Sequence, residues 1–135
     1  MTPLFDTSAV LAHYLAKSGA ERVQALFDDP GAVIGICIVS LLEFETRLHA
    51  MGLSEAERRA ELQKYKQVID EFVPVDEAVC ARAAELKRST SARLPSIDAL
   101  IAAAASLRAA TLVHRDPHFL AIPPNLLTQE CLPAK

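Results

Sequence analysis

The sequence contains no tryptophan and few other aromatic residues, which make up 5% of its 135 positions. An aromatic platform on which nucleic-acid bases stack is therefore not expected. Alanine, leucine and valine dominate the apolar half of the composition instead, which suits helices packed on a sheet. Because the chain shows no repeat or linker and is long enough to bury one core, we expect a single domain over residues 1–135.

Long apolar runs and cysteine pairs are also absent. The longest apolar run, AVIGICIVSLL, is too short to cross a bilayer, and no basic residue precedes the first apolar stretch as in a secretory signal. Cys37, Cys80 and Cys131 are far apart and form no CxxC pair, so we interpret them as reduced thiols that mostly pack in the interior. These features predict a cytoplasmic protein without a membrane segment.

Basic residues are outnumbered, and a net charge of −3 by itself disfavours a nucleic-acid partner. The charge is uneven, however, because residues 82–135 carry seven basic and only four acidic side chains. The stretch LKRSTSARLPS, with Lys87, Arg88 and Arg93, is either a solvated helix end and loop or a patch that binds RNA phosphates beside the acids described below. The alternative set of RNA-binding cations is Arg47, Arg58 and Arg59.

Strand and helix patterns alternate along the chain. Strands are expected at residues 2–5, 32–39, 72–75 and 111–114, with NLLTQ (125–129) as a possible fifth, and helices at 8–17, 20–28, 41–50, 54–70, 77–89 and 97–109. Such alternation predicts an α/β fold with a parallel sheet covered on both faces. Pro74 cannot donate a ladder hydrogen bond, so its strand is expected at an edge, and Asp76 after it is interpreted only as a helix cap.

Four acids stand where predicted strands end or helices begin. Asp6 and Asp116 directly follow the first and fourth strands. Glu43 lies just inside the helix after the second strand, and Asp98 just inside the helix over 97–109. Because the carboxyl ends of parallel strands share one edge, where α/β sheets bind ligands, we expect these four side chains to meet there.

Each acid also has a local structural explanation. Asp6 and Asp116 occupy positions typical of helix N-caps, and Asp98 would complement a helix dipole. SLLE (40–43) fits a capping box in which Ser40 is the cap and Glu43 reaches back. If the four carboxylates meet at one edge of the sheet, something must offset their repulsion, because each like-charged pair about 4 Å apart costs about 4 kcal/mol at an effective dielectric of about 20. Raised pKa values or a divalent cation would offset this cost, and an all-oxygen set without cysteine favours Mg²⁺ or Mn²⁺.

Four fragments, in this order, resemble the PIN-domain family, in particular the small VapC-type toxins of bacterial toxin–antitoxin pairs. They are LFDTSAVLA (4–12), IVSLLEFE (38–45), LPSIDALIAAAA (94–105) and LVHRDPHF (112–119), and the match extends to about residue 128. The resemblance implies a three-layer α/β/α fold with a parallel sheet of order 3-2-1-4-5.

The resemblance also implies an activity, that of a Mg²⁺- or Mn²⁺-dependent endoribonuclease that hydrolyses RNA phosphodiester bonds. Asp6, Asp98 and Asp116 match metal-binding acids of the family. Glu43 matches the remaining catalytic acid, after the second strand.

Polar residues beside the acids match the family in part. Thr7 and Ser8 match positions whose hydroxyls can hold a water on the metal or a substrate phosphate. At HRDPHF the chain departs from the family, because many relatives have threonine in place of His114 and a further acid in place of His118. One interpretation is that both histidines are polar residues at the sheet edge where the strands end. The alternative is that His118 contacts a substrate phosphate or transfers a proton.

Two functions of different class follow from these observations, a metal-dependent ribonuclease and a non-catalytic RNA- or protein-binding adaptor on the same fold. The helices at 41–50 and 54–70 look like a protruding pair, with Phe44, Leu48 and Met51 on one side. These side chains either pack in the core or, as the resemblance suggests, line a groove for a cognate antitoxin near a homodimer contact.

Overall fold

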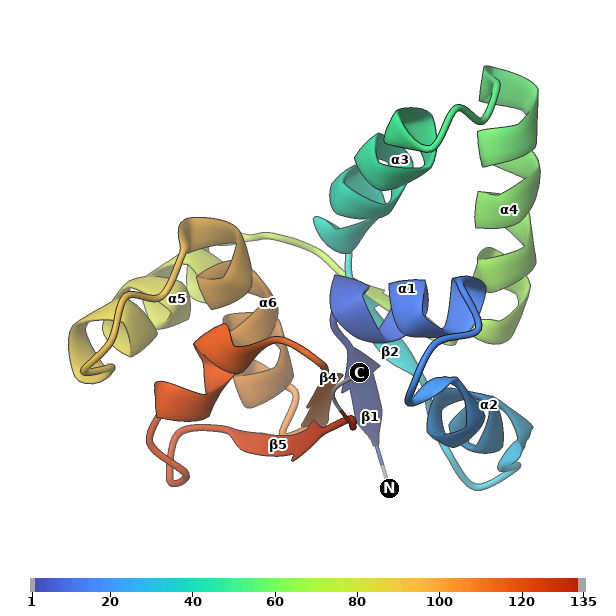
Figure 1. Ribbon diagram of the computed structural model, residues 1–135. Helices are drawn as coiled ribbons and strands as arrows, with labels where there is room; N and C mark the ends of the chain where they lie inside the picture. The colour runs from blue at the N-terminus through green and yellow to red at the C-terminus, as the bar shows by residue number, and fades with distance from the viewer. Residues whose placement is uncertain (1, 134–135) are drawn as a thin grey trace.

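A computed structural model describes residues 2–133, which form a five-stranded parallel sheet between two layers of helices (Figure 1). The strands are β1 (Pro3–Phe5), β2 (Gly35–Cys37), β3 (Glu71–Val73), β4 (Thr111–His114) and β5 (Thr128–Cys131). They lie in the order β3-β2-β1-β4-β5, and each neighbouring pair is parallel. The predicted order 3-2-1-4-5 is confirmed, and β3 is an edge strand as expected.

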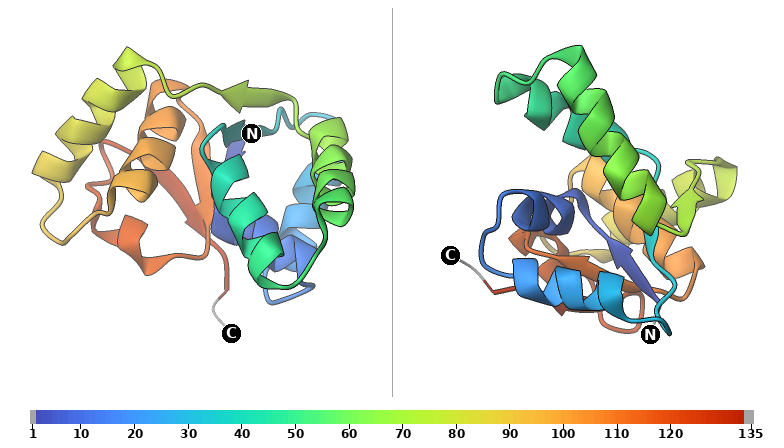
Figure 2. Two further views of the ribbon diagram at one scale, coloured as in Figure 1. Left: turned by 90° about the horizontal axis from the view of Figure 1, so that it is seen from above. Right: turned by 90° about the vertical axis from the view of Figure 1, so that its right-hand side faces the viewer.

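The helices form the outer layers. They are α1 (Thr7–Tyr14), α2 (Ala20–Asp28), α3 (Ser40–Ala50), α4 (Glu55–Val68), α5 (Glu77–Ser89) and α6 (Ser96–Leu107), and a short 3₁₀ helix, η1 (Pro117–Ala121), follows β4. α5 and α6 cover one face of the sheet, and α1 and α2 cover the other (Figure 1). α3 and α4 form a pair that stands out from the rest of the molecule (Figure 2). The predicted α/β/α architecture is therefore confirmed.

Turns and a proline explain why three strands differ from the sequence prediction. β2 begins later than expected, because the N–H of Ala32 donates to the carbonyl of Asp29 in a turn (3.1 Å). β3 ends before Pro74, which has no N–H to donate to the ladder. β5 begins after most of NLLTQ, because the N–H of Leu126 closes a turn on the carbonyl of Pro123 (2.9 Å).

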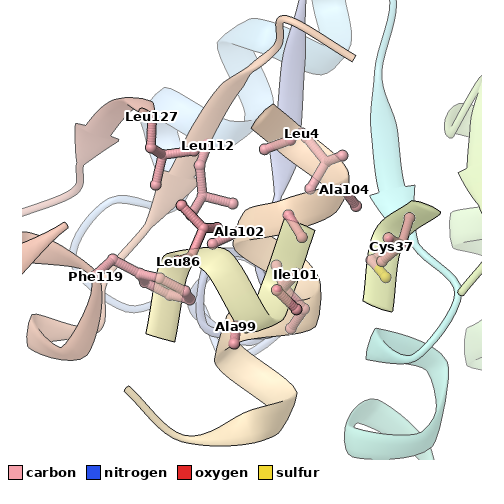
Figure 3. Packing of buried hydrophobic residues seen from close by; sticks show 14 of the residues in the cluster. Leu4, Cys37, Leu86, Ala99, Ile101, Ala102, Ala104, Leu112, Phe119 and Leu127 are labelled. Atoms are coloured by element: carbon pink, nitrogen blue, oxygen red, sulfur yellow. The ribbon is translucent and has the colours of Figure 1, made fainter. Parts of the chain in front are cut away.

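Successive residues of the central strands face opposite layers, as the period of two requires. Leu4 of β1 and Leu112 of β4 belong to a buried cluster with α5 and α6 (Figure 3), whereas Phe5 and Val113 pack with α1, α2, α3 and α4. α6 contributes four consecutive alanines, Ala102–Ala105, all fully buried. Their small side chains let α6 lie close to the sheet, and this contact fixes the start of α6 at the edge where the strands end.

The protruding helix pair contributes to the core as well. Phe44 and Leu48 of α3 are 3% and 0% exposed and pack in the cluster with α1 and α4. Core packing is therefore confirmed for these two residues, and only Met51, 37% exposed, remains available to a partner.

The cysteines divide differently from the sequence interpretation. All three are free thiols, but only Cys37 is buried, whereas Cys80 and Cys131 are exposed. The expectation that the cysteines mostly pack in the interior is therefore wrong. Across residues 2–133, no helix combines the length and apolar character needed to span a membrane.

Asp76 provides a test of local helix capping. Its carboxylate accepts a hydrogen bond from the N–H of Val79 (2.9 Å) and caps α5, as predicted. Asp76→Ala should therefore lower the free energy of unfolding by about 1 kcal/mol and leave the specific activity of the folded protein unchanged. Urea unfolding measures the first effect. A large loss of activity at unchanged stability would contradict the assignment of Asp76 as a cap only.

Candidate active site

The four predicted acids line one open hollow at the carboxyl ends of the central strands. The hollow measures about 240 Å³ and is lined by Asp6, Thr7, Ser8, Leu11, Glu43, Asp98 and Asp116. These residues come from the start of α1, the first turns of α3 and α6, and the chain after β4. Figure 1 shows these elements meeting near the upper ends of β1 and β4. The expected convergence of the four acids is confirmed, and we call the hollow that they line the acid hollow.

Asp6 is the most deeply buried of the four acids, at 3% exposed. It caps α1, and its Oδ2 accepts hydrogen bonds from the N–H (3.1 Å) and the hydroxyl (2.5 Å) of Ser8. Burial raises the pKa of Asp6 to about 7, with smaller contributions from the charges of Asp98 and Glu43 and with the Ser8 bonds acting in the opposite direction. The two Ser8 bonds do not offset the cost of removing this carboxylate from water.

Ser8 also connects the two central strands. Its Oγ accepts a hydrogen bond from the N–H of Arg115 (2.9 Å), while the N–H of Asp6 donates to the carbonyl of Val113 (3.0 Å). The turn after β1 is thus fixed against the chain after β4. These bonds hold Asp6 in place relative to Asp116, the next residue along that chain.

Glu43 does not form the predicted capping box. The cap position of α3 is Val39, without a side-chain cap bond, and the buried hydroxyl of Ser40 has no hydrogen-bond partner in the described part of the chain. The Glu43 carboxylate instead accepts a hydrogen bond from Oγ1 of Thr7 (2.6 Å). The capping interpretation of SLLE is therefore wrong, because Thr7, distant in sequence, turns this carboxylate toward the acid hollow.

Asp98 and Asp116 are bridged by His118. The Nδ1 atom of His118 lies 3.1 Å from a carboxylate oxygen of Asp98 and 3.1 Å from one of Asp116. The pKa of Asp98 is raised to about 6, mainly by burial and also by the charge of Asp116, while His118 acts in the opposite direction. The His118 ring, half-exposed, therefore occupies a position from which it can donate to either carboxylate or join them in binding a cation.

His114 has a structural role that the sequence interpretation missed. It is fully buried against the Phe119 ring, so its interpretation as a polar residue at the sheet edge is wrong. Its Nδ1 accepts from the N–H of Asp116 (3.2 Å), and its Nε2 lies 2.8 Å from Oε1 of Gln129. Burial is the main cause that lowers the pKa of His114, which keeps the ring neutral. His114, held by Gln129, thereby positions the backbone of Asp116.

The predicted phosphate-binding residues Lys87, Arg88 and Arg93 lie at the end of α5 and in the loop before α6. Figures 1 and 2 show α5 on the far side of α6 from α1, and none of these three residues lines the acid hollow. The Lys87 ammonium donates to the carbonyl of Leu94 (2.8 Å) and lies 3.3 Å from the hydroxyl of Ser96, so it braces this loop. Arg88 and Arg93 are exposed.

The raised pKa of Asp6 makes stability depend on pH. Folded Asp6 keeps its proton up to about pH 7, whereas the unperturbed group releases it near pH 3.8, so ionisation between these values opposes folding. Without divalent cations, Asp6→Asn should therefore gain stability over the wild type as pH rises through this window, by up to about 4 kcal/mol. Urea unfolding in EDTA at several pH values measures the difference.

Asp76→Asn is the matched control, since it makes the same change at a helix cap outside the acid hollow. It should show no comparable gain with pH. A stability difference between Asp6→Asn and the wild type that stays constant with pH would contradict the protonation of buried Asp6.

The comparisons with known proteins agree with this fold. None of the curated proteins matches the chain. A chain of the VapBC2 complex from Rickettsia felis, solved with a DNA fragment from the promoter, aligns with a TM-score of 0.77 and 20% identity over 98% of this chain and 100% of that one. The corresponding values are 0.73 and 18% for VapBC-1 from nontypeable Haemophilus influenzae, over 97% and 98% of the two chains. They are 0.66 and 24% for VapBC-5 of Mycobacterium tuberculosis, of the VapBC family of toxin–antitoxin systems, over 98% of each chain.

At these identities the solved structures show a shared fold, and the family follows from the sequence. The family model described as PIN domain matches residues 4–123, a span that includes most of β1, all of β2, β3 and β4, and all four acids of the acid hollow. This chain therefore belongs to the PIN domain family.

Proposed function

We propose that this protein is a Mg²⁺- or Mn²⁺-dependent endoribonuclease that hydrolyses RNA phosphodiester bonds, and that it is the toxin of a VapC-type toxin–antitoxin pair. The observation that carries the proposal is the convergence of four carboxylates on one open hollow. Burial is the main cause that raises the pKa of Asp6 to about 7 and that of Asp98 to about 6, and the charges of neighbouring acids add to it, so a bound cation would favour the ionised form of both carboxylates.

The donor set of the acid hollow fits a hard divalent cation. The lining residues offer carboxylate and hydroxyl oxygens and include no cysteine. Asp6, Asp98 and Asp116 would hold the cation, since all three line the hollow. Ligand atoms of Asp98, Asp116 and His118 lie within 4.8 Å of one another, so the imidazole of His118 is a further candidate ligand. When bound, such a cation lowers the pKa of water and stabilises the negative charge that develops on a phosphate under attack.

The other polar groups of the hollow have separate roles in this proposal. Thr7 fixes one carboxylate oxygen of Glu43, which leaves the second oxygen to orient and deprotonate the attacking water. Ser8 donates both its hydroxyl and its N–H to Asp6, and its hydroxyl oxygen accepts from the N–H of Arg115, so these bonds favour positioning of Asp6 over phosphate contact. His118, at the outer side of Asp98 and Asp116, can pass a proton to the leaving oxygen.

The partner assignment rests on the solved relatives. The complexes from Rickettsia felis, Haemophilus influenzae and Mycobacterium tuberculosis are VapBC assemblies, and their aligned chains match this chain almost end to end. We propose by analogy that this chain binds a cognate antitoxin and forms a homodimer. A non-catalytic adaptor on the same fold is the alternative, and its acids would then serve only as caps.

Loss of a single ligand tests the enzyme against the adaptor. Asp98→Asn keeps the shape of the side chain but removes a charge that a cation needs, so RNA cleavage should fall on the order of 100-fold or more while the fold is retained. Wild-type cleavage should also stop in EDTA and return with Mg²⁺ or Mn²⁺. Asp76→Asn is again the control and should cleave like the wild type. Full activity of Asp98→Asn at ordinary Mg²⁺ would refute the metal-site assignment.

The cleavage products test the proposed nucleophile. Because water attacks, the 2′-hydroxyl of the substrate is not needed, and the products should carry 5′-phosphate and 3′-hydroxyl ends. RNA end-mapping in cells that co-express the adjacent gene, before and after that gene is shut off, measures the ends and identifies the cleaved RNA. Cyclic phosphate ends would show that the 2′-hydroxyl is the nucleophile and would exclude this mechanism.

A further inference from the structure

A second open hollow adjoins the acid hollow and has the opposite charge. It measures about 240 Å³ and is lined by Ser8, Leu11, Ala12, Leu15, Lys17, Arg47 and Arg115. We call it the basic hollow. It shares Ser8 and Leu11 with the acid hollow, so the two form one continuous surface over α1. No acidic residue of the described chain lines the basic hollow.

The two arginines are carried by the same elements as the acids. Arg47 lies four residues after Glu43 on α3, which places both on one face of that helix. Arg115 directly precedes Asp116, and its N–H donates to the Ser8 hydroxyl that also holds Asp6. The hydrogen bonds that fix the acids therefore also fix the backbone beside the basic hollow.

These arginines also differ from most others in the chain. Five arginines form ion pairs with glutamates: Arg22, Arg58, Arg59, Arg82 and Arg108. The guanidinium groups of Arg47 and Arg115 have no ion-pair or hydrogen-bond partner within residues 2–133. A guanidinium that is not neutralised internally is free to bind a phosphate in two-point fashion.

We propose that the basic hollow binds a backbone phosphate of the RNA strand next to the phosphodiester that enters the acid hollow. This inference rests on the proposed function and names the path that the substrate takes. RNA is repelled by the four acids unless a neighbouring site supplies positive charge. Arg47 and Arg115 supply it across the shared wall of Ser8 and Leu11, whereas Arg88 at the end of α5 and Arg93 in the loop before α6 line neither hollow.

Two double variants with the same change of charge separate these two locations. The probe is a fluorescein-labelled single-stranded RNA of about 20 nucleotides with mixed sequence, because phosphate contacts do not depend on sequence. Affinity is measured by anisotropy against salt in Ca²⁺, with intact RNA verified on a denaturing gel. Arg47→Gln/Arg115→Gln should bind about 25-fold more weakly at 0.1 M salt and lower the log–log salt slope by about 1.4, since each contact on a single strand contributes about 0.7.

Arg88→Gln/Arg93→Gln is the matched control and should bind within about twofold of the wild type with an unchanged slope. Equal losses in the two variants would show a general effect of net charge and overturn the proposal, and so would a loss confined to the control pair. Arg47→Lys/Arg115→Lys, which keeps the charge, should retain most of the salt slope and serves as the check on folding. Weaker binding of the antitoxin with unchanged binding of RNA would assign the basic hollow to the protein partner instead.

The same samples distinguish this inference from the proposed function. If the wild type binds RNA through Arg47 and Arg115 but cleaves nothing in Mg²⁺ or Mn²⁺, the basic hollow stands and the nuclease assignment fails. If the wild type cleaves RNA and the Arg47→Gln/Arg115→Gln variant binds it as tightly as the wild type does, the nuclease stands and the basic hollow does not bind substrate.

Discussion

The repulsion between carboxylates that are partly removed from water is the constraint on which the rest of this structure depends. Asp6 is buried between the ends of β1 and β4, and its ionised form is disfavoured before any other acid is considered. Glu43 and Asp98 add like charge from two different helices. Bonds to Ser8 and Thr7 hold two of these carboxylates in place, so the chain does not relieve the repulsion by turning the side chains outward. The cation proposed above would relieve it instead.

Helix capping and cation binding use the same local geometry, and topology decides between them. Asp6, Asp76 and Asp116 all follow strands, and each accepts a hydrogen bond from a backbone N–H of the next helix. β1 and β4 are adjacent in the centre of the sheet, whereas β3 is an edge strand. Asp6 and Asp116 therefore line the same hollow, whereas Asp76 is not among the residues that line it. Under the proposed function, the two facing caps would serve as ligands of one cation, and Asp76 would remain a cap only.

Sequence periodicity was sufficient to predict the layers and the convergence of the acids, and the strand order came from the resemblance to the family. It failed where a partner distant along the chain overrides a local motif. SLLE reads as a capping box, but Thr7 takes the Glu43 carboxylate. The sequence predicts that His114 lies at the sheet edge, but its buried ring has a partner in Gln129 of β5. The start of β5 depends on a turn between Pro123 and Leu126 that the pattern of NLLTQ does not predict. Local patterns contain no information on such contacts.

Charge shows the same limit more sharply. The run with Lys87, Arg88 and Arg93 is dense in sequence, yet Lys87 braces the loop before α6 and none of the three residues lines the acid hollow, so their contact with RNA stays a prediction. Arg47 and Arg115 are isolated in sequence, but Arg47 lies about one helical turn after Glu43 and Arg115 directly precedes Asp116. An element that delivers an acid to the hollow thus delivers a nearby arginine to its rim. Such coupling gives an acidic protein of net charge −3 a positive surface beside its negative centre, which the proposed RNA substrate would require.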